Sequence, residues 1–255
     1  MSQVPKLTRA RQLAGSVWPG RAVDGYANLI VARLRKLAAA KSTGMLPFSG
    51  HGEGGIFFRD GRVVYAESSR TPGRNAGGLA ALGLGPAEQD PEPDGPRSLG
   101  WLTAELARAE ATVDAALDLV SSESRYAKFR PDEVPAAGHA CDIPLETLLT
   151  EVERRRRVLR QLASIVTADT TVVRDAQMTS PSLQVSALQW SLLVRVRAGA
   201  TARDLAIELN RGVFGTTIEV YRLLALGLLS APGYDVKEAR DHDVVSFIRA
   251  ASEER

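Results

Sequence analysis

The stretch that decides the fold of the front of this chain is GGIFFRDGRVVYAES, residues 54–68. Two apolar runs flank the central pair Asp60 and Gly61. Asp-Gly between apolar runs is the strongest short-range signal for a β-hairpin, because a type I′ turn needs a positive φ at both central residues. We therefore predict antiparallel strands at 55–58 and 63–67, with Asp60 and Gly61 as the structural turn.

Helical periodicity surrounds this hairpin. A first helix is predicted over 24–43, with Asp24 as its N-cap and Gly44 as the left-handed residue after its end. Its apolar stripe consists of Tyr26, Ile30, Leu34 and Leu37. The remaining elements expected in the front of the chain are a strand at 45–48, a weak helix within 71–85, a helix at 99–122, a strand at 125–131 and a helix at 144–163.

Two charged segments interrupt this pattern. Residues 86–98 carry four prolines and four acidic residues, so they are predicted to form a solvated loop. Residues 153–157 read Glu-Arg-Arg-Arg-Arg inside the helix 144–163. Consecutive helical residues point in different directions, so this run predicts a solvated face in preference to a phosphate site.

The C-terminal third reads as three helices and a strand. A helix is predicted at 185–197, and a second after the capping box of Thr201 and Asp204. The glycines at 212 and 215 are expected to break the chain before a third helix, which starts with a capping box at 216–219. A strand at 227–229 and a short helix at 244–251 follow. This order is typical of a winged helix-turn-helix. The candidate DNA or phosphate contacts are Arg203, Arg211, Thr216, Thr217 and Arg222. The alternative use of such a module is dimerisation or docking of a partner protein.

Composition narrows the function. Thirty-two basic and 30 acidic residues give a net charge of +2, so no global charge favours nucleic acid. One cysteine excludes an internal disulfide, and with three histidines it makes a metal site improbable. No apolar run approaches the length of a membrane span, and no secretory signal is visible, so a cytoplasmic location is expected.

No catalytic motif stands out. Residues 50–55 formally fit G-x-G-x-x-G, but a strand is predicted after them where the dinucleotide fingerprint requires a helix. No histidine lies in a recognisable triad setting. We therefore assign no catalytic, cofactor-binding or metal-binding residue and expect a protein without enzymatic activity.

The front segment resembles the PATAN-type domain, named for the N-terminal region of the cyanobacterial PatA regulator. The resemblance covers about residues 20–163. The matching positions are Thr43, Gly44, Gly55, Ile56, Phe58, Asp60, Gly61, Val63, Val64 and Ala66. It implies a non-catalytic signalling module that acts near small GTPases or their roadblock-type partners, and the back of the chain is similar to the winged-helix tail of actinobacterial relatives. This chain departs from response regulators in having no visible receiver domain, so a phosphorylation input cannot be inferred from the resemblance.

Together these patterns predict an α+β protein with a small antiparallel sheet and packed helices, followed by a mainly α winged helix-turn-helix-like domain. The predicted boundaries are an arm at 1–23, the PATAN-like domain at 24–163, a linker at 164–182 and the winged-helix-like domain at 183–255. The leading hypothesis is a bacterial regulatory or adaptor protein whose front binds a protein and whose tail contacts protein or DNA. The alternatives are a sequence-specific transcriptional regulator and an uncharacterised enzyme; a homodimer is one candidate assembly.

Overall fold

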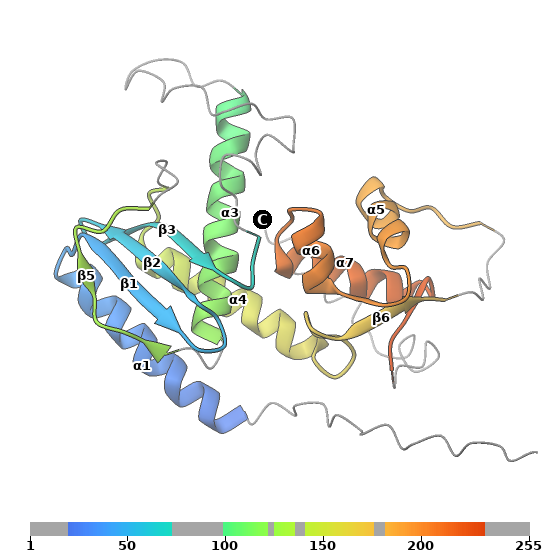
Figure 1. The fold of residues 1–255 in the computed structure, drawn as a ribbon, viewed down its shortest axis with the longest axis horizontal. Helices are drawn as coiled ribbons and strands as arrows, with labels where there is room; N and C mark the ends of the chain where they lie inside the picture. Colours follow the sequence, from blue (N-terminus) through green and yellow to red (C-terminus); the bar gives the residue numbers. More distant parts are fainter. Residues whose placement is uncertain (1–19, 73–98, 122–124, 136–140, 176–181, 233–255) are drawn as a thin grey trace, which may run out of the picture.

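The protein is an α+β structure with small antiparallel sheets (Figure 1). The computed structural model describes residues 20–72, 99–121, 125–135, 141–175 and 182–232. The elements of the front part are α1 (Gly20–Ala39), β1 (Gly44–Ser49), β2 (Gly54–Arg59), β3 (Arg62–Ser68), α3 (Leu99–Ser121), β4 (Arg125–Tyr126) and β5 (Arg130–Pro131). Helix α4 (Leu145–Leu162) follows. The back part comprises β6 (Thr171–Arg174), α5 (Ala187–Arg195), β7 (Ala200–Thr201), α6 (Ala202–Glu208), α7 (Val213–Ala225) and β8 (Leu229–Ser230).

The front sheet has the order β3-β2-β1-β4, and β5 also pairs with β1. Helices α1, α3 and α4 lie behind this sheet (Figure 1). Apolar residues of β1, β2 and β3 pack with residues of the three helices in the first core. The most deeply buried side chains of this core include Ile30, Leu34, Leu46, Ile56, Phe58, Leu119 and Leu148.

Asp60 and Gly61 form the reversal between β2 and β3. Their neighbours Arg59 and Arg62 are paired across the antiparallel ladder. The φ angles of Asp60 and Gly61 are 50° and 79°, both in the left-handed region that the predicted hairpin turn requires. The Gly61 N–H donates to the carbonyl of Ser42, which ties the turn to the segment that follows α1.

The end of α1 differs from the prediction. The helix stops at Ala39, and Lys41, with φ 49°, is the left-handed residue that follows it. Gly44 instead opens β1 with φ 138°. A Cβ atom on Gly44 would lie 2.2 Å from the carbonyl oxygen of Arg130, so this glycine is needed where β5 crosses close to β1.

The predicted strand 125–131 is two short strands. Tyr126 of β4 pairs with Phe48, and Arg130 of β5 pairs with Met45. Between them the Ala127 N–H donates to the carbonyl of Pro47, so the chain stays beside β1. The ladder is interrupted, and Pro131 has no N–H with which to continue it.

The predicted linker 164–182 contains a strand of the back part. Strand β6 pairs with both β7 and β8, which gives the order β7-β6-β8. Val172 of β6 is fully buried in the second core. The β-branched run Thr171-Val172-Val173 explains the strand, because such side chains pack well on a pleated surface. The prediction of a linker there was wrong for this segment.

Helix α7 starts earlier than predicted. It begins at Val213 after Gly212, and it runs through Gly215, where the sequence suggested a break. The second predicted capping box does not form, because the Thr216 hydroxyl donates to the Gly212 carbonyl inside the helix. Gly215 costs about 1 kcal/mol of helix propensity, and tertiary packing of the helix overrides this preference. The first capping box, between Thr201 and Asp204, is present.

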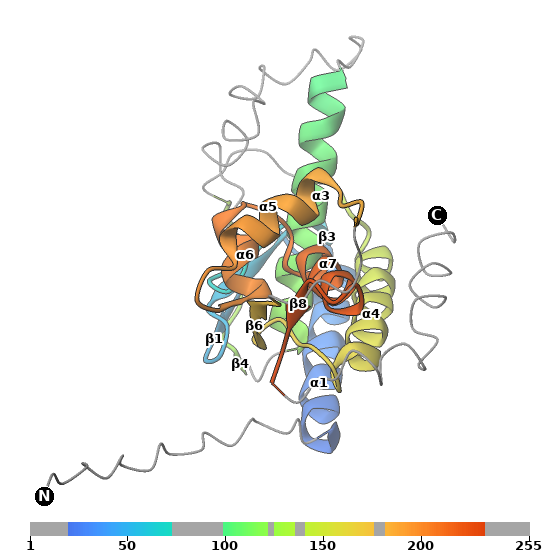
Figure 2. The same cartoon turned by 90° about the vertical axis from the view of Figure 1, so that its right-hand side faces the viewer.

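Helix α4 joins the two cores. Leu148 and Val152 in its first half pack in the first core, and Val158 and Leu162 pack in the second. The helix extends from behind the front sheet into the back part (Figure 1). Figure 2 views the back part face-on, with β6, β8 and helices α5 to α7 in front of α3.

Several predictions lie outside the described residues. They are the arm up to residue 19, most of the weak helix 71–85, the loop 86–98 and a short C-terminal helix expected at 244–251. Residues 20–23, predicted as part of the arm, belong to α1. Within the described part of the chain, no helix is long and apolar enough to cross a membrane.

Candidate functional site at the junction of the two cores

A cavity of about 270 Å³ lies where the front part, α4 and the back part meet. Its polar lining residues are His51, Arg70, Thr71, Asp114, Asp118, Ser121, Arg156, Arg160, Thr167, Asp169, Arg203 and Thr217. Its apolar lining residues are Leu117, Leu159, Ala163, Ala168, Val213 and Phe214. Binding sites in proteins are often located at such junctions, so this cavity is the first candidate for a functional site.

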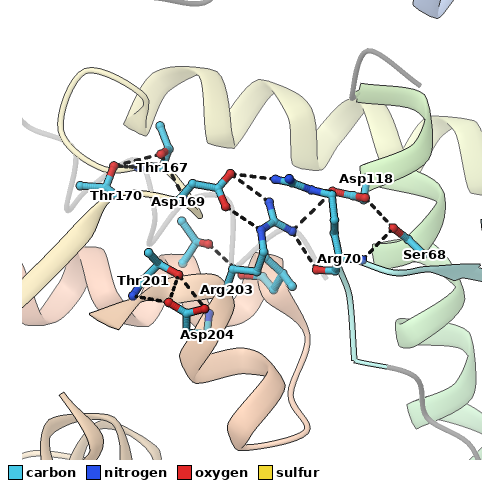
Figure 3. Close-up of polar contacts among 11 residues, drawn as sticks. Ser68, Arg70, Asp118, Thr167, Asp169, Thr170, Thr201, Arg203 and Asp204 are labelled. Atoms are coloured by element: carbon cyan, nitrogen blue, oxygen red, sulfur yellow. Dashed lines mark hydrogen bonds and ion pairs between the residues drawn. The ribbon is translucent and has the colours of Figure 1, made fainter. Parts of the chain in front are cut away.

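Arg203 of α6 links the back part to the front part (Figure 3). Its Nε lies 2.7 Å from Asp169 Oδ1 and its Nη2 lies 3.2 Å from Asp169 Oδ2. Its Nη1 donates to the carbonyl of Arg70 at 2.8 Å and reaches Asp118 Oδ1 at 3.5 Å. The Arg203 guanidinium therefore pairs with Asp169 and also contacts Arg70 and Asp118 of the front part.

Arg70, just after β3, completes the same network from the other side (Figure 3). Its Nη2 lies 2.9 Å from Asp169 Oδ2, and its Nε lies 3.4 Å from Asp118 Oδ1. The Ser68 hydroxyl donates to Asp118 Oδ2 at 2.6 Å. Burial would raise the pKa of Asp169, but the hydrogen bonds and charges of Arg203 and Arg70 lower it below its ordinary value.

A second ion-pair cluster lies deeper, between α3 and α4. Arg155 Nη1 donates to Asp114 Oδ1 at 2.6 Å, and the same guanidinium contacts Glu110 and Glu151. Burial raises the pKa of Asp114, and the charge of Arg155 opposes that rise. Arg154 and Arg155 together lower the pKa of Glu151 to about 2, although burial acts against them. The prediction of a solvated arginine face was therefore wrong for Arg155, which is buried.

The first turn of α7 docks on this cluster. The Phe214 N–H donates to Asp114 Oδ2 at 3.4 Å, and the Phe214 ring centroid lies 5.0 Å from the Arg155 guanidinium carbon. A Cβ atom on Gly212 would lie 2.6 Å from Asp114 Oδ2. Asp114 thus supplies an acceptor to a helix terminus that has orphan N–H donors, and it does so from the front part.

The five candidate contact residues do not form one surface. Thr216 and Thr217 are 2% and 0% exposed, and their hydroxyls donate to carbonyls of Gly212 and Val213. Arg222 forms an ion pair with Glu219, three residues earlier. Arg211 is exposed in the turn before α7. Only Arg203 and Thr217 line the junction cavity.

Sequence reasoning missed most of the junction. Asp114 and Asp118 lie one helical turn apart on α3 among buried alanine and leucine residues. Arg155 occupies the apolar stripe of α4 between Val152 and Val158. A charged residue at a position of the apolar stripe is a signal that the sequence does contain. Such a residue is expected to be buried, and buried charges are normally paired with an opposite charge. The single cysteine, Cys141, is buried, and the nearby His139 lies outside the described residues.

No known protein family matches this chain, and no curated protein or solved structure matches it. What the junction can do therefore follows from its geometry. The arginines pair with carboxylates across the two parts, and the cavity beside them is lined by both apolar and charged side chains.

Proposed function

We propose that this protein is a non-enzymatic bacterial regulator or adaptor of the cytoplasm, with a PATAN-like front domain and a winged-helix-like tail. The observation that carries this proposal is the docking of α7 on the front part through Asp114 and Phe214. In a DNA-binding helix-turn-helix, the second helix of the pair lies in the major groove and contacts the bases. Here its first turn is committed to contacts within the chain, which favours a relay between two modules over independent DNA reading.

The residues on the solvent-facing side of α7 favour a protein partner over DNA. Gly215 and the C-cap residue Leu226 are exposed, and Glu219 and Arg222 between them at helical spacing are partly exposed. Glu219 pairs with Arg222 and accepts a hydrogen bond from Gln189. A base-reading face normally offers free Arg, Lys, Asn or Gln donors, and this stripe has its single cation neutralised.

Exposed apolar side chains on α5 also favour a protein partner. Trp190 and Val194 lie one turn apart, with 61% and 49% of their surfaces exposed. Tryptophan is enriched at the energetic centres of protein interfaces. Helix α5 is held by a capping box between Ser186 and Gln189, so it presents these side chains on a rigid element.

For the front domain, the partner class suggested by the PATAN resemblance is a small GTPase or a roadblock-type regulator, with a homodimer as the other candidate assembly. The lack of enzymatic activity is supported by the state of the junction acids. Asp118 and Asp169 are held by arginines, and a carboxylate with a lowered pKa, as for Asp169, is a weak general base. The enzyme alternative would be favoured by turnover that depends on His51 or Ser121.

The transcriptional-regulator alternative depends on Arg211, which is exposed beside the start of α7. Affinity capture from lysate of the source organism, combined with a mobility shift on genomic DNA, separates the two functions. We expect Trp190→Ala to abolish capture of a specific protein and Arg211→Ala to retain it, with no sequence-specific shift at physiological salt. A shift with a steep salt dependence that Arg211→Ala abolishes and Trp190→Ala preserves would establish the alternative.

A further inference from the structure

The three aspartates that line the junction cavity are already hydrogen-bonded within the chain. Both carboxylate oxygens of Asp114 already accept a hydrogen bond, from Arg155 and from the Phe214 N–H. Both oxygens of Asp118 and of Asp169 are likewise occupied by hydrogen bonds from within the chain. Each of these carboxylates is therefore paired with an arginine of the chain, which offsets its negative charge toward an incoming anion.

The donors are not all committed. A guanidinium carries five N–H groups. Arg70 donates through Nε and Nη2, and Arg160 donates through Nη2 alone, so within the described residues Nη1 of each arginine has no partner. The Ser121 hydroxyl is buried and has no hydrogen-bond partner among the residues that the structure describes. All three side chains line the cavity.

The volume and the apolar lining of the cavity indicate which ligands fit it. Leu117, Leu159 and Phe214 provide an apolar surface from α3, α4 and α7. The volume of about 270 Å³ exceeds that of an apolar cavity of about 150 Å³ that binds benzene. A compact body of roughly two fused rings therefore fits this volume.

We propose that the junction cavity binds a small organic anion, in which a compact apolar body packs on Leu117, Leu159 and Phe214 and one oxyanion accepts hydrogen bonds from Arg70, Arg160 and Ser121. Residues of the front part, α4 and the back part all contact this ligand. Its binding therefore stabilises the joined arrangement over a separated one. The site does not depend on the partner of the proposed function.

The test is calorimetric titration of the purified full chain with 2-naphthoate, with its neutral isostere 2-naphthamide and with phenyl phosphate. We expect one-to-one binding of an anionic probe and at least tenfold weaker binding of the amide. Tighter binding of phenyl phosphate than of 2-naphthoate would identify the oxyanion as a phosphate and would equally support the site.

A matched pair of variants locates the binding. Arg160→Gln removes a lining guanidinium and should weaken the anion at least tenfold, whereas Arg157→Gln removes an exposed arginine of the same helix outside the cavity and should leave affinity within twofold. Circular dichroism checks that both variants are folded. The proposal would be overturned by any of three results. These are equal affinity for the acid and the amide, equal effects of the two variants, and no saturable binding of either anion at millimolar concentration.

Discussion

Asp114 of α3 and Arg155 of α4 form an ion pair at 2.6 Å, with only 3% and 6% of their side chains exposed. A buried charge without its partner is costly, whereas replacement of a whole buried pair by apolar residues is often neutral. The same aspartate accepts a hydrogen bond from the first turn of α7. This pair therefore connects the packing of the first core to the position of the back part.

Asp114→Ala should lower the free energy of unfolding by about 3 kcal/mol, because it leaves the Arg155 guanidinium without its most buried partner. The double variant Asp114→Leu/Arg155→Met should recover most of that loss. Urea denaturation of the three proteins measures both effects. A double variant as unstable as the single one would show that the ion pair has no special cost when broken.

A pair of glycines tests the hairpin and α7. Gly61→Ala should destabilise the protein by about 1–3 kcal/mol, because its φ is 79° and a Cβ would lie 2.4 Å from the Ala38 carbonyl oxygen. Gly215→Ala should instead stabilise it by about 1 kcal/mol, since it lies inside α7 with nothing within 4 Å of the added atom. Thermal denaturation should show melting temperatures that move in opposite directions.

Acid should destabilise the protein through Glu151, whose carboxylate pairs with Arg154 and Arg155 of its own helix α4. The pKa of this residue is about 2 in the folded protein against an ordinary value of 4.5. Its contribution is therefore complete above pH 4.5 and is lost as the pH falls toward 2. We expect a loss of about 1–2 kcal/mol after allowance for solvent around the side chain. In Glu151→Gln this part of the acid sensitivity should be absent, and identical profiles for the two proteins would contradict the assignment.

Arg203 should control how firmly the back part is held. Arg203→Ala removes the contacts with Asp118 and the Arg70 carbonyl, so amide hydrogen exchange in residues 213–220 should accelerate by about tenfold. Arg222→Ala breaks an ion pair with Glu219 on the surface of α7 and serves as the control. If both variants exchange at the rate of the wild-type protein, Arg203 has no such role.

The sequence predicted the front of the fold well where periodicity and turn chemistry agreed. The hairpin at Asp60 and Gly61 and the helices later found as α3 and α4 are present within a few residues of their predicted positions. Local turn signals misplaced the start of α7, because packing of Val220 and Leu223 in the second core outweighs the helix-breaking preference of Gly215.

The junction could be predicted only in part. Arg203 was singled out for phosphate contact, but its partners Asp118 and Asp169 come from distant segments that no local pattern connects to it. Arg155 was treated as one of a solvated run because the four arginines were considered together. Its position one turn from Val152 and Val158 separates it from Arg157, which is exposed.

The contact between the two parts is tested most directly by a double-mutant cycle on Arg70 and Asp169, whose side chains meet across the junction at 2.9 Å. The free energies of unfolding of Arg70→Gln, Asp169→Asn and the double variant are compared with that of the wild-type protein. We predict a coupling energy of about 1 kcal/mol, since residues in one ion-pair network are rarely additive. Additive effects, with a coupling below about 0.3 kcal/mol, would contradict the joined arrangement on which the proposed function rests.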